Sequence, residues 1–562
     1  MSRIFANRSY LLVGAIALAA GSLALGQEPQ PQPPPAAENP SGAPITTVDK
    51  FEYVPLEALP AVKGVSGYEW DAKNPVVKFP INVWIGWAPI IVANGGFAPS
   101  KDSIFYKKHG FQVELVLIDN PITARDTYAS GKAHVLWGTL DMMALFAAEL
   151  AKDSRTALRI CQQIDWSNGG DGIVARGGIK TINDLKPKDG KKRVIALAQS
   201  SPSHYYILNL LYYAGIEPGE VEFRFTGDAF QAAASFVNDK TVDACVTWAP
   251  DIYNISDPQK SGIKDAVLVS STKDAKRVIA DVWAARADFV RDHPEVVKGL
   301  VAGIFEGMDL VKKDPKAAAA LVAKCYNLKP EDAEGMMGDA HPTNYAENVE
   351  FFVNKNNPAN FEQTWNNITN IYGRAGFLNP KAQPSWTEVA VPALIADDEL
   401  KAQFKHHQNE YVDKFAAVTV GTDFDPAKKK SILTRTVRIH FAPNVALVDP
   451  SYDPNAEKIV EEVGRMAGQF GASIIVVRGH ADRSKYEEAK KLGEAYFQKH
   501  TQMVKELSER RAKGVVEALI KKFPEFEKQR DKFLAEGVGW AEPLANDALS
   551  RRVEIKVLSP EE

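Results

Sequence analysis

Short apolar runs alternate with amphipathic stretches through the first large part of the chain. The run at 79–86 is rich in β-branched and aromatic residues, and a helical stretch follows it. The same alternation continues through the segments 110–119, 121–151, 193–216, 221–227 and 229–253. Strands that alternate with helices are typical of parallel sheets with helices on both faces. We therefore predict the α/β fold class for this region.

The pattern becomes helical after about residue 285 and changes again after residue 384. Residues 385–430 are mixed and charged, and we interpret them as a connector. A second alternating region follows, with predicted strands at 434–441, 472–479 and 551–557, a helix at 455–470 and a long helical stretch to Lys522. The units predicted in this way are 1–26, 27–75, 76–384, 385–430 and 431–562.

The first 26 residues have the pattern of a secretory signal peptide. Arg3 and Arg8 precede an apolar run of sixteen residues, 11–26, which is short for a membrane span of about 20 residues. The run ends in a small-x-small sequence, so we expect cleavage before Gln27. An uncleaved N-terminal anchor is the alternative. The proline-rich stretch that opens 27–75 predicts an extended linker, which serves either as a tether or as a leader without a role.

Composition narrows the possible functions only a little. The 562 residues are 45% hydrophobic and 25% charged, and a net charge of −4 gives no reason to expect a nucleic-acid partner. Three widely spaced cysteines, Cys161, Cys245 and Cys325, favour buried thiols over a metal site. The adjacent His406 and His407 are expected to be solvated residues of a helix. We predict no metal and no cofactor.

Two polar turns follow apolar strands and open helices. Ser200 and Ser201 lie in the turn at 199–204, and Gly138 with Thr139 lie in the turn at 137–141. A helix N-terminus offers free N–H donors and partial positive charge, which suits an oxyanion. Two such turns at strand ends could converge on one ligand. Ordinary helix capping is the alternative interpretation.

The order of these segments resembles that of solute-binding proteins of ABC transporters, of the nitrate, sulfonate and taurine type. The resemblance covers roughly residues 78–385 and depends on many weak motifs in order. It implies a two-lobed periplasmic-binding-protein fold (type II) that closes on a small solute. The implied ligand contacts are Trp87, Gly138, Thr139, Ser200, Ser201 and Trp248. For the two tryptophans, core packing is the alternative, and Ala249 stands where the family often has an acidic residue.

The last region resembles the OmpA-like domain that binds peptidoglycan. The motifs G-H-x-D, L-S-x-x-R-A, G-x-x-W-x-x-P-x-x-x-N and R-R-V-x-I occur in order within residues 434–558. The resemblance implies that Asp482 accepts from the ammonium of diaminopimelate and that Arg511 pairs with its carboxylate. Asn444 would be a supporting contact. The alternative is that Asp482 caps a helix and Arg511 makes a surface ion pair.

This region also departs from the pattern that it resembles. Ala481 and Val504 stand where the family usually has Thr and Asn, and residues 484–506 lengthen the interval between Asp482 and Arg511. The added residues either preserve the geometry of the pair or cover it. His480 has no accompanying nucleophile or base, so we expect it to be a turn or packing residue.

Together the two resemblances predict a periplasmic or envelope protein of a Gram-negative-type cell. It would capture an anionic or zwitterionic solute, pass it to an ABC permease and ATPase acting in trans, and be anchored to peptidoglycan. We predict that it is not an enzyme, because no G-x-S-x-G, H-E-x-x-H or P-loop motif occurs. The alternatives are an envelope-structural or solute-sensing protein, and a pyrimidine-processing enzyme.

Overall fold

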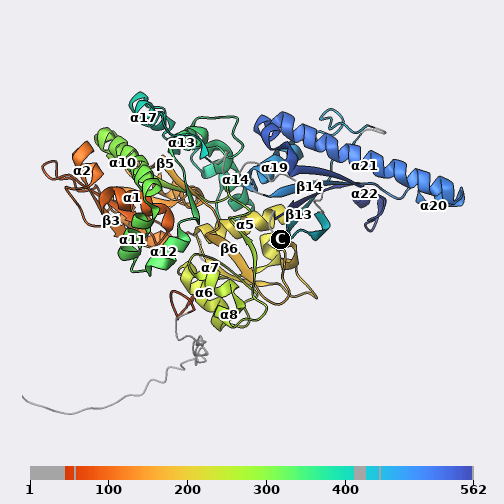
Figure 1. Ribbon diagram of the computed structural model, residues 1–562, viewed down its shortest axis with the longest axis horizontal. Helices are drawn as coiled ribbons and strands as arrows, with labels where there is room; N and C mark the ends of the chain where they lie inside the picture. Colours follow the sequence, from red (N-terminus) through yellow and green to blue (C-terminus); the bar gives the residue numbers. More distant parts are fainter. Residues whose placement is uncertain (1–44, 56–58, 411–425, 442–444, 472, 560–562) are drawn as a thin grey trace, which may run out of the picture. The chain divides into compact units, whose positions relative to one another are not determined.

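The structure is a computed structural model that describes residues 45–55, 59–410, 426–441, 445–471 and 473–559 (Figure 1). The expected signal peptide, residues 27–44 and 56–58 of the expected linker, and Asn444 lie outside the described residues. Within the described residues, no helix is long and apolar enough to cross a membrane.

The first lobe is built around a sheet whose strands run in the order β12-β5-β11-β4. These strands are Ala340–Pro342, Leu158–Ser167, Ala280–Arg286 and Val135–Thr139. A parallel pair, β2 (Val76–Ile81) and β3 (Gln112–Leu117), continues this sheet, because the His134 amide beside β4 donates to the Lys78 carbonyl of β2 at 3.1 Å. The helices of this lobe are α1 (Ala88–Asn94), α2 (Ile104–His109), α3 (Pro121–Ala129), α4 (Leu140–Leu150), α9 (Ala287–Asp292), α10 (Pro294–Lys313), α11 (Pro315–Tyr326), α12 (Pro330–Met336) and α13 (Tyr345–Phe352).

The second lobe is built around a six-stranded sheet in the order β1-β8-β7-β9-β6-β10. These strands are Tyr53–Val54, Glu222–Thr226, Val194–Ala198, Ala244–Trp248, Asp171–Ala175 and Val267–Ser271. Only the pairs of β7 with β8 and with β9 are parallel. Its helices are α5 (Pro202–Ala214), α6 (Ala229–Asn238), α7 (Asp251–Ser256) and α8 (Pro258–Ser261). The predicted α/β class is confirmed for this part of the chain, although its sheets are mixed rather than purely parallel.

Besides the passage from β1 to β2, the chain crosses between the two sheets twice. Residues 168–170 join β5 to β6, and residues 272–279 join β10 to β11. A later helix, α14 (Phe361–Arg374), packs on α4 of the first lobe and on α5 of the second. The short helices α15 (Trp386–Val389), α16 (Pro392–Ile395) and α17 (Asp398–Gln403) follow, and Val391 donates to the Ile160 carbonyl of β5 at 3.0 Å. This part of the expected connector therefore packs on the first lobe.

The C-terminal region forms its own sheet, in the order β13-β16-β14-β15. Its strands are Ser431–Val437, Val553–Leu558, Ile474–His480 and Phe533–Gly539, and its helices are α19 (Ala456–Gln469), α20 (Tyr486–Lys491), α21 (Glu494–Lys522) and α22 (Asp547–Ser550). The long helix α21, blue in Figure 1, packs along β14 and β15. The strand β15 was not predicted, because alanine and glycine weaken its apolar pattern.

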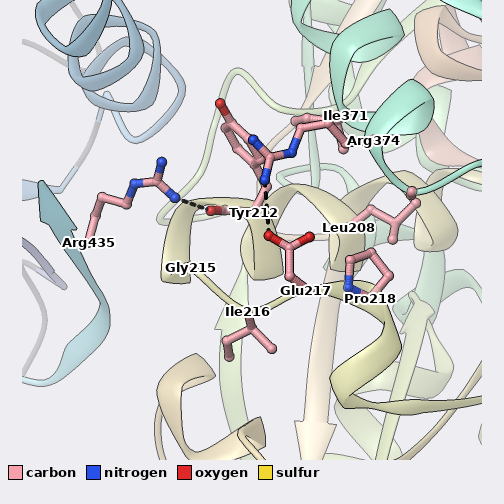
Figure 2. A pocket seen from close by; sticks show the side chains of 10 residues that line it. Leu208, Tyr212, Gly215, Ile216, Glu217, Pro218, Ile371, Arg374 and Arg435 are labelled. Carbon is pink, nitrogen blue, oxygen red and sulfur yellow. Dashed lines mark hydrogen bonds and ion pairs between the residues drawn. The ribbon is translucent and has the colours of Figure 1, made fainter. Parts of the chain in front are cut away.

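Hydrogen bonds tie the C-terminal region to the second lobe. The Arg435 guanidinium donates to the Tyr212 carbonyl at 2.7 Å, and the Thr434 amide donates to Asn183 Oδ1 at 2.8 Å. Arg374 pairs with Glu217 at 3.0 Å beside this contact, as Figure 2 shows. Arg435, Arg374 and Glu217 line a pocket of about 30 Å³. This volume has room for about one water molecule and not for a solute.

Candidate functional site: the cleft between the lobes

Five of the six expected ligand contacts lie where strands end and helices begin. Gly138 and Thr139 are the last two residues of β4, and α4 starts at the next position. Ser200 and Ser201 follow β7, and Ser201 is the N-cap of α5. Trp248 is the last residue of β9. All five residues are buried.

Strand register places two of these residues at the edges where the chain crosses between lobes. Thr139 lies opposite Asp281 at the start of β11, just after one crossing. Trp248 lies opposite Asp171 at the start of β6, just after the other crossing. Residues directly opposite in an antiparallel pair project from the same face of the sheet. Each lobe therefore presents one expected contact beside a buried aspartate.

The turn that carries the two serines has an unusual backbone. Ser200 has a φ of 58°, in the left-handed region that favours glycine, which costs of order 1 kcal/mol for another residue. Its amide approaches His204 Nδ1 at 3.4 Å, and the Ser201 hydroxyl donates to the Ala198 carbonyl at 2.8 Å. Ser201, the N-cap of α5, makes no side-chain cap hydrogen bond, so the start of this helix is shaped by a constrained turn and not by a capping side chain.

The two tryptophans have different surroundings. Trp87 is fully buried, donates from Nε1 to Asn82 Oδ1 at 2.7 Å, and packs edge-on against Phe79. Its surroundings are those of a core residue, which was the alternative interpretation. Trp248 packs against Phe230, and its Nε1 has no hydrogen-bond partner among the described residues. A buried indole N–H without a partner is costly, so it favours a site for a missing acceptor.

A group of buried aspartates was missed by the sequence reasoning. Asp165 on β5 lies opposite Asp281 on β11, in the same row as Thr139. Their two carboxyl groups share a hydrogen bond, and burial raises the pKa of both above the ordinary range. Mutual repulsion raises the pKa of Asp281 further. Single aspartates on separate strands give no local pattern, so only strand pairing could reveal this row.

Two further carboxyls belong to the same electrostatic group. Burial raises the pKa of Asp141, the second residue of α4, to about 7, although the Tyr372 hydroxyl donates to it at 3.3 Å. Burial also raises the pKa of Asp171 to about 7, although Ser167 donates to it at 2.6 Å. In the described part of the chain, the charges that act most on these carboxyls are those of other aspartates. The region is therefore deficient in positive charge.

Close packing holds Asp165 in place. Trp84 Nε1 donates to Asp165 Oδ2 at 3.2 Å, and the backbone of Gly86 passes directly above this carboxyl. A Cβ on Gly86 would lie 1.8 Å from Asp165 Oδ2, so a side chain cannot be accommodated there. The turn after β2 thus contributes Trp84 and Gly86 to the site, next to the expected Trp87.

A cavity of about 630 Å³ opens between the lobes, and neither these aspartates nor the six expected contacts line it. One wall comes from the start of α7 in the second lobe, including Asp251 and Tyr253. The facing wall comes from residues 327–336, which include most of α12 in the first lobe. Residues 45–47 form a third wall. Its volume lies within the range of about 300–1,000 Å³ typical of small-molecule sites.

Comparison with known proteins shows what this part of the chain is similar to. Residues 95–318 match the family described as "NMT1/THI5 like". Similar proteins are solute-binding proteins, as the sequence analysis expected.

The similar proteins include a taurine-binding protein, a putative binding protein and a nitrate-binding protein. The taurine-binding periplasmic protein of Escherichia coli is 25% identical over 246 residues, which cover 42% of this chain and 71% of that protein. A putative binding protein of Brucella abortus is 25% identical over 41% of this chain and 66% of its own length. Among solved structures, the periplasmic nitrate-binding protein of Synechocystis PCC 6803 has a TM-score of 0.45 at 17% identity, covering 59% of this chain and 89% of that one.

A second candidate site lies on the C-terminal sheet. Asp482 accepts from Ser484 N at 2.9 Å and from Arg551 Nη1 at 3.1 Å, and its side chain stays 18% exposed. Burial works to raise its pKa, but these hydrogen bonds and the Arg551 charge hold it below the ordinary value. Arg511 stacks over the Phe441 ring at 5.1 Å. Burial lowers the pKa of Arg511, and the negative charge of Asp482 acts against this shift. The two side chains are partly exposed and electrostatically coupled.

The lengthened interval between Asp482 and Arg511 folds into α20 and the first turns of α21. Its aromatic side chains pack around Trp540, with Phe497 stacked on that ring at 5.9 Å and Tyr486 edge-on at 5.2 Å. Of the added residues, Ser484 contacts the Asp482 carboxylate, which stays 18% exposed.

The histidines have structural surroundings. His480 ends β14, is fully buried and lies 3.3 Å from Glu554 Oε2. His480, Glu542 and Glu554 have the spacing of a metal group, but Arg478 donates to both glutamates at 2.8 to 3.2 Å, and Arg552 pairs with Glu554 at 2.8 Å. His480 is therefore a buried partner of an ion-pair network.

His406 and His407 both pair with Asp309, and they differ in exposure. The side chain of His406 is 57% exposed, whereas that of His407 is 6% exposed, so the expectation that both are solvated is wrong for His407. His407 Nδ1 accepts from the Tyr345 amide at 3.1 Å, so its proton lies on Nε2 and is donated to Asp309 at 2.9 Å. Neither ring nitrogen of His407 then has a lone pair for a metal.

Proposed function

We propose that the protein is a solute-binding protein of the cell envelope, which captures a small solute between its two lobes for uptake by an ABC transporter. The observation that carries this proposal is the convergence of the strand-end turns with Trp248 and buried carboxyls at the edge between the lobes. The permease and ATPase would act in trans. The similarity to the taurine-binding protein supports the same class of function.

The aspartates narrow the class of solute. Asp171, Asp281 and Asp165 are buried at the strand ends beside Trp248 and Thr139, and a bare anion such as nitrate would meet their repulsion in a poorly solvated place. A protonated amine would instead pair with a carboxylate, while the partial positive charge at the N-terminus of α5 suits an acid group at the other end of the solute. Of the expected anionic and zwitterionic solutes, we therefore propose a zwitterion with an ammonium group.

A panel of small compounds tests this proposal by thermal shift. Taurine and β-alanine represent zwitterions, nitrate and ethanesulfonate represent anions, and ethylamine carries only the ammonium. We expect a zwitterion at 100 times its Kd to stabilise the protein by about 2.7 kcal/mol, and the simple anions to have no effect. Asp171→Asn should weaken this response, whereas Asp184→Asn on the exposed surface should not. A response to nitrate and not to any amine would contradict the proposed class.

The C-terminal domain is proposed to bind peptidoglycan through Asp482 and Arg511. Their partial exposure and opposite charges support this, because the diaminopimelate side chain presents an ammonium beside a carboxylate. In a pull-down with purified peptidoglycan, Asp482→Ala and Arg511→Ala should each lose most of the bound fraction. Arg510→Ala, at an exposed neighbouring position, is the matched control. Equal binding by all three variants would exclude this site.

A wall-bound sensing or structural protein is the alternative, and the thermal panel separates it from transport. A structural protein would respond to none of the compounds. A pyrimidine-processing enzyme would convert a pyrimidine substrate to product, which the same panel extended to pyrimidines can detect by mass change.

A further inference from the structure

The chain segment Ile45–Val54, which precedes the first lobe in the sequence, lies along the second lobe. Tyr53 and Val54 form β1, which pairs with β8 in the register Tyr53 to Thr226 and Val54 to Phe225. The Tyr53 hydroxyl also interacts with Asp239 at 2.8 Å. This end of the segment is therefore fixed to the outer strand of the second lobe.

The other end of the segment is held inside the cavity between the lobes. The Thr47 amide donates to Asp251 Oδ1 at 2.8 Å, and the Thr47 hydroxyl donates to the same oxygen at 2.6 Å. Asp251 is fully buried, and burial raises its pKa to about 7. Ile45 and Thr46 are also buried, each with 7% exposure. The segment thus satisfies a carboxyl that would otherwise face the cavity.

Val48 lies between these two anchors and packs on the second lobe. It packs against the apolar cluster of Phe230 and Trp248 in the second lobe, and Val83 of the first lobe packs against the same cluster. Trp248 is one of the expected ligand contacts, and Val83 follows β2 directly before Trp84. The side chain of Val48 therefore covers the apolar wall of the proposed solute site.

The residues that follow return to the first lobe. Arg125 of α3 donates to the Pro60 carbonyl at 2.7 Å, and Arg286 at the end of β11 donates to the Ser66 carbonyl at 2.9 Å. One stretch of chain is thus bound to both lobes. Separation of the lobes would have to break contacts on one side.

We infer that Ile45–Val54 is an intramolecular plug, which occupies the solute cleft and must leave before a solute binds. This inference rests on the proposed solute-binding function. A tethered competitor acts at an effective concentration of about millimolar, so it lowers the apparent solute affinity by the fraction of molecules in which it is bound. The displacing solute would place an apolar body over Trp248, where Val48 lies, and would release Thr47 from Asp251.

Hydrogen exchange on the full chain tests the plug without any solute. The variant Thr47→Val with Val48→Asp removes the hydroxyl donor and places a charge against Trp248. We expect the amides of 222–231 and 244–252 to exchange at least ten times faster in this variant. Lys50→Ala, at an exposed position of the same segment, should leave them unchanged. Equal exchange rates in wild type and the double variant would overturn the inference.

Solute titration separates this inference from the proposed function. If taurine or β-alanine binds, we expect the double variant to bind it about ten times more tightly than wild type. Thr47→Ser, which keeps the hydroxyl, should bind like wild type. Equal affinity in the double variant would overturn the plug. If no compound binds either protein, the proposed solute class fails, and the exchange rates alone decide whether the plug exists.

Discussion

At the scale of single residues, the geometry of the site depends on positions where an added side chain would collide with a neighbour. Gly86 is one of them, because its missing side chain lets the backbone cross the Asp165 carboxyl. Trp84 adds a hydrogen bond to the same carboxyl at 3.2 Å. Both residues are explained by what lies across from them in space.

We predict that Gly86→Ala destabilises the protein by about 1–3 kcal/mol, since Asp165 or the turn must move to avoid the new Cβ. Thermal unfolding measures the effect as a lower Tm. Gly67→Ala is the control, because a Cβ at Gly67 meets no atom within 4 Å. Equal Tm values for the two variants would show that the turn is not packed as described.

At the scale of strands, paired β5 and β11 bring carboxyls together that would repel each other if charged. Burial raises the pKa of Asp165 and Asp281 on these strands, and that of Asp171 on β6. The folded chain therefore holds protons that the unfolded chain releases. For a group whose folded pKa is raised in this way, stability is greatest at low pH. It is lost as pH rises through the folded pKa, which is about 7 for Asp171.

We therefore predict that Asp171→Asn flattens the decline of Tm between pH 5 and pH 8. The variant should match wild type near pH 5 and exceed it by roughly 2–4 °C at pH 8, because the amide never has to lose a proton. Calorimetry across this pH range makes the measurement. Parallel curves for the two proteins would mean that Asp171 is already charged in the folded state.

In the C-terminal region, α20 and the start of α21 depend on the aromatic contacts of Trp540. Phe497→Ala removes one stacked ring and should lower stability by about 1–2 kcal/mol, while leaving Asp482 and Arg511 in place. Denaturant unfolding and the peptidoglycan pull-down measure the two effects separately. Loss of peptidoglycan binding in a folded Phe497→Ala protein would show that the added residues 484–506 take part in peptidoglycan binding.

At the scale of the whole described chain, the C-terminal domain and the second lobe share hydrogen bonds at Asn183 and Arg435. A further buried bond joins Asn209 Nδ2 to Gln469 Oε1 at 3.0 Å. Contacts of this kind couple the unfolding of two domains. The same hydrogen bonds restrict independent motion of the C-terminal domain and the second lobe.

We predict that the double variant Asn183→Ala with Arg435→Ala uncouples the two domains. Calorimetry should then resolve a separate transition for the C-terminal domain, a few degrees below that of the lobes. Arg438→Ala, at an exposed position of the same segment, should leave the wild-type profile unchanged. An unchanged profile in the double variant would show that these bonds contribute nothing to the coupling.

The sequence by itself determined the alternation of strands and helices, the α/β class and the strand-end positions of Thr139, Ser201 and Trp248. These features follow from local periodicity and turn chemistry, which neighbouring residues carry. Strand pairing decided the row of Asp165 and Asp281 and the placement of Asp171 beside Trp248. The course of Ile45–Val54 over the cleft was decided in the same way. Such contacts join residues far apart in the chain, so no local pattern contains them, and only the tertiary structure brings them together.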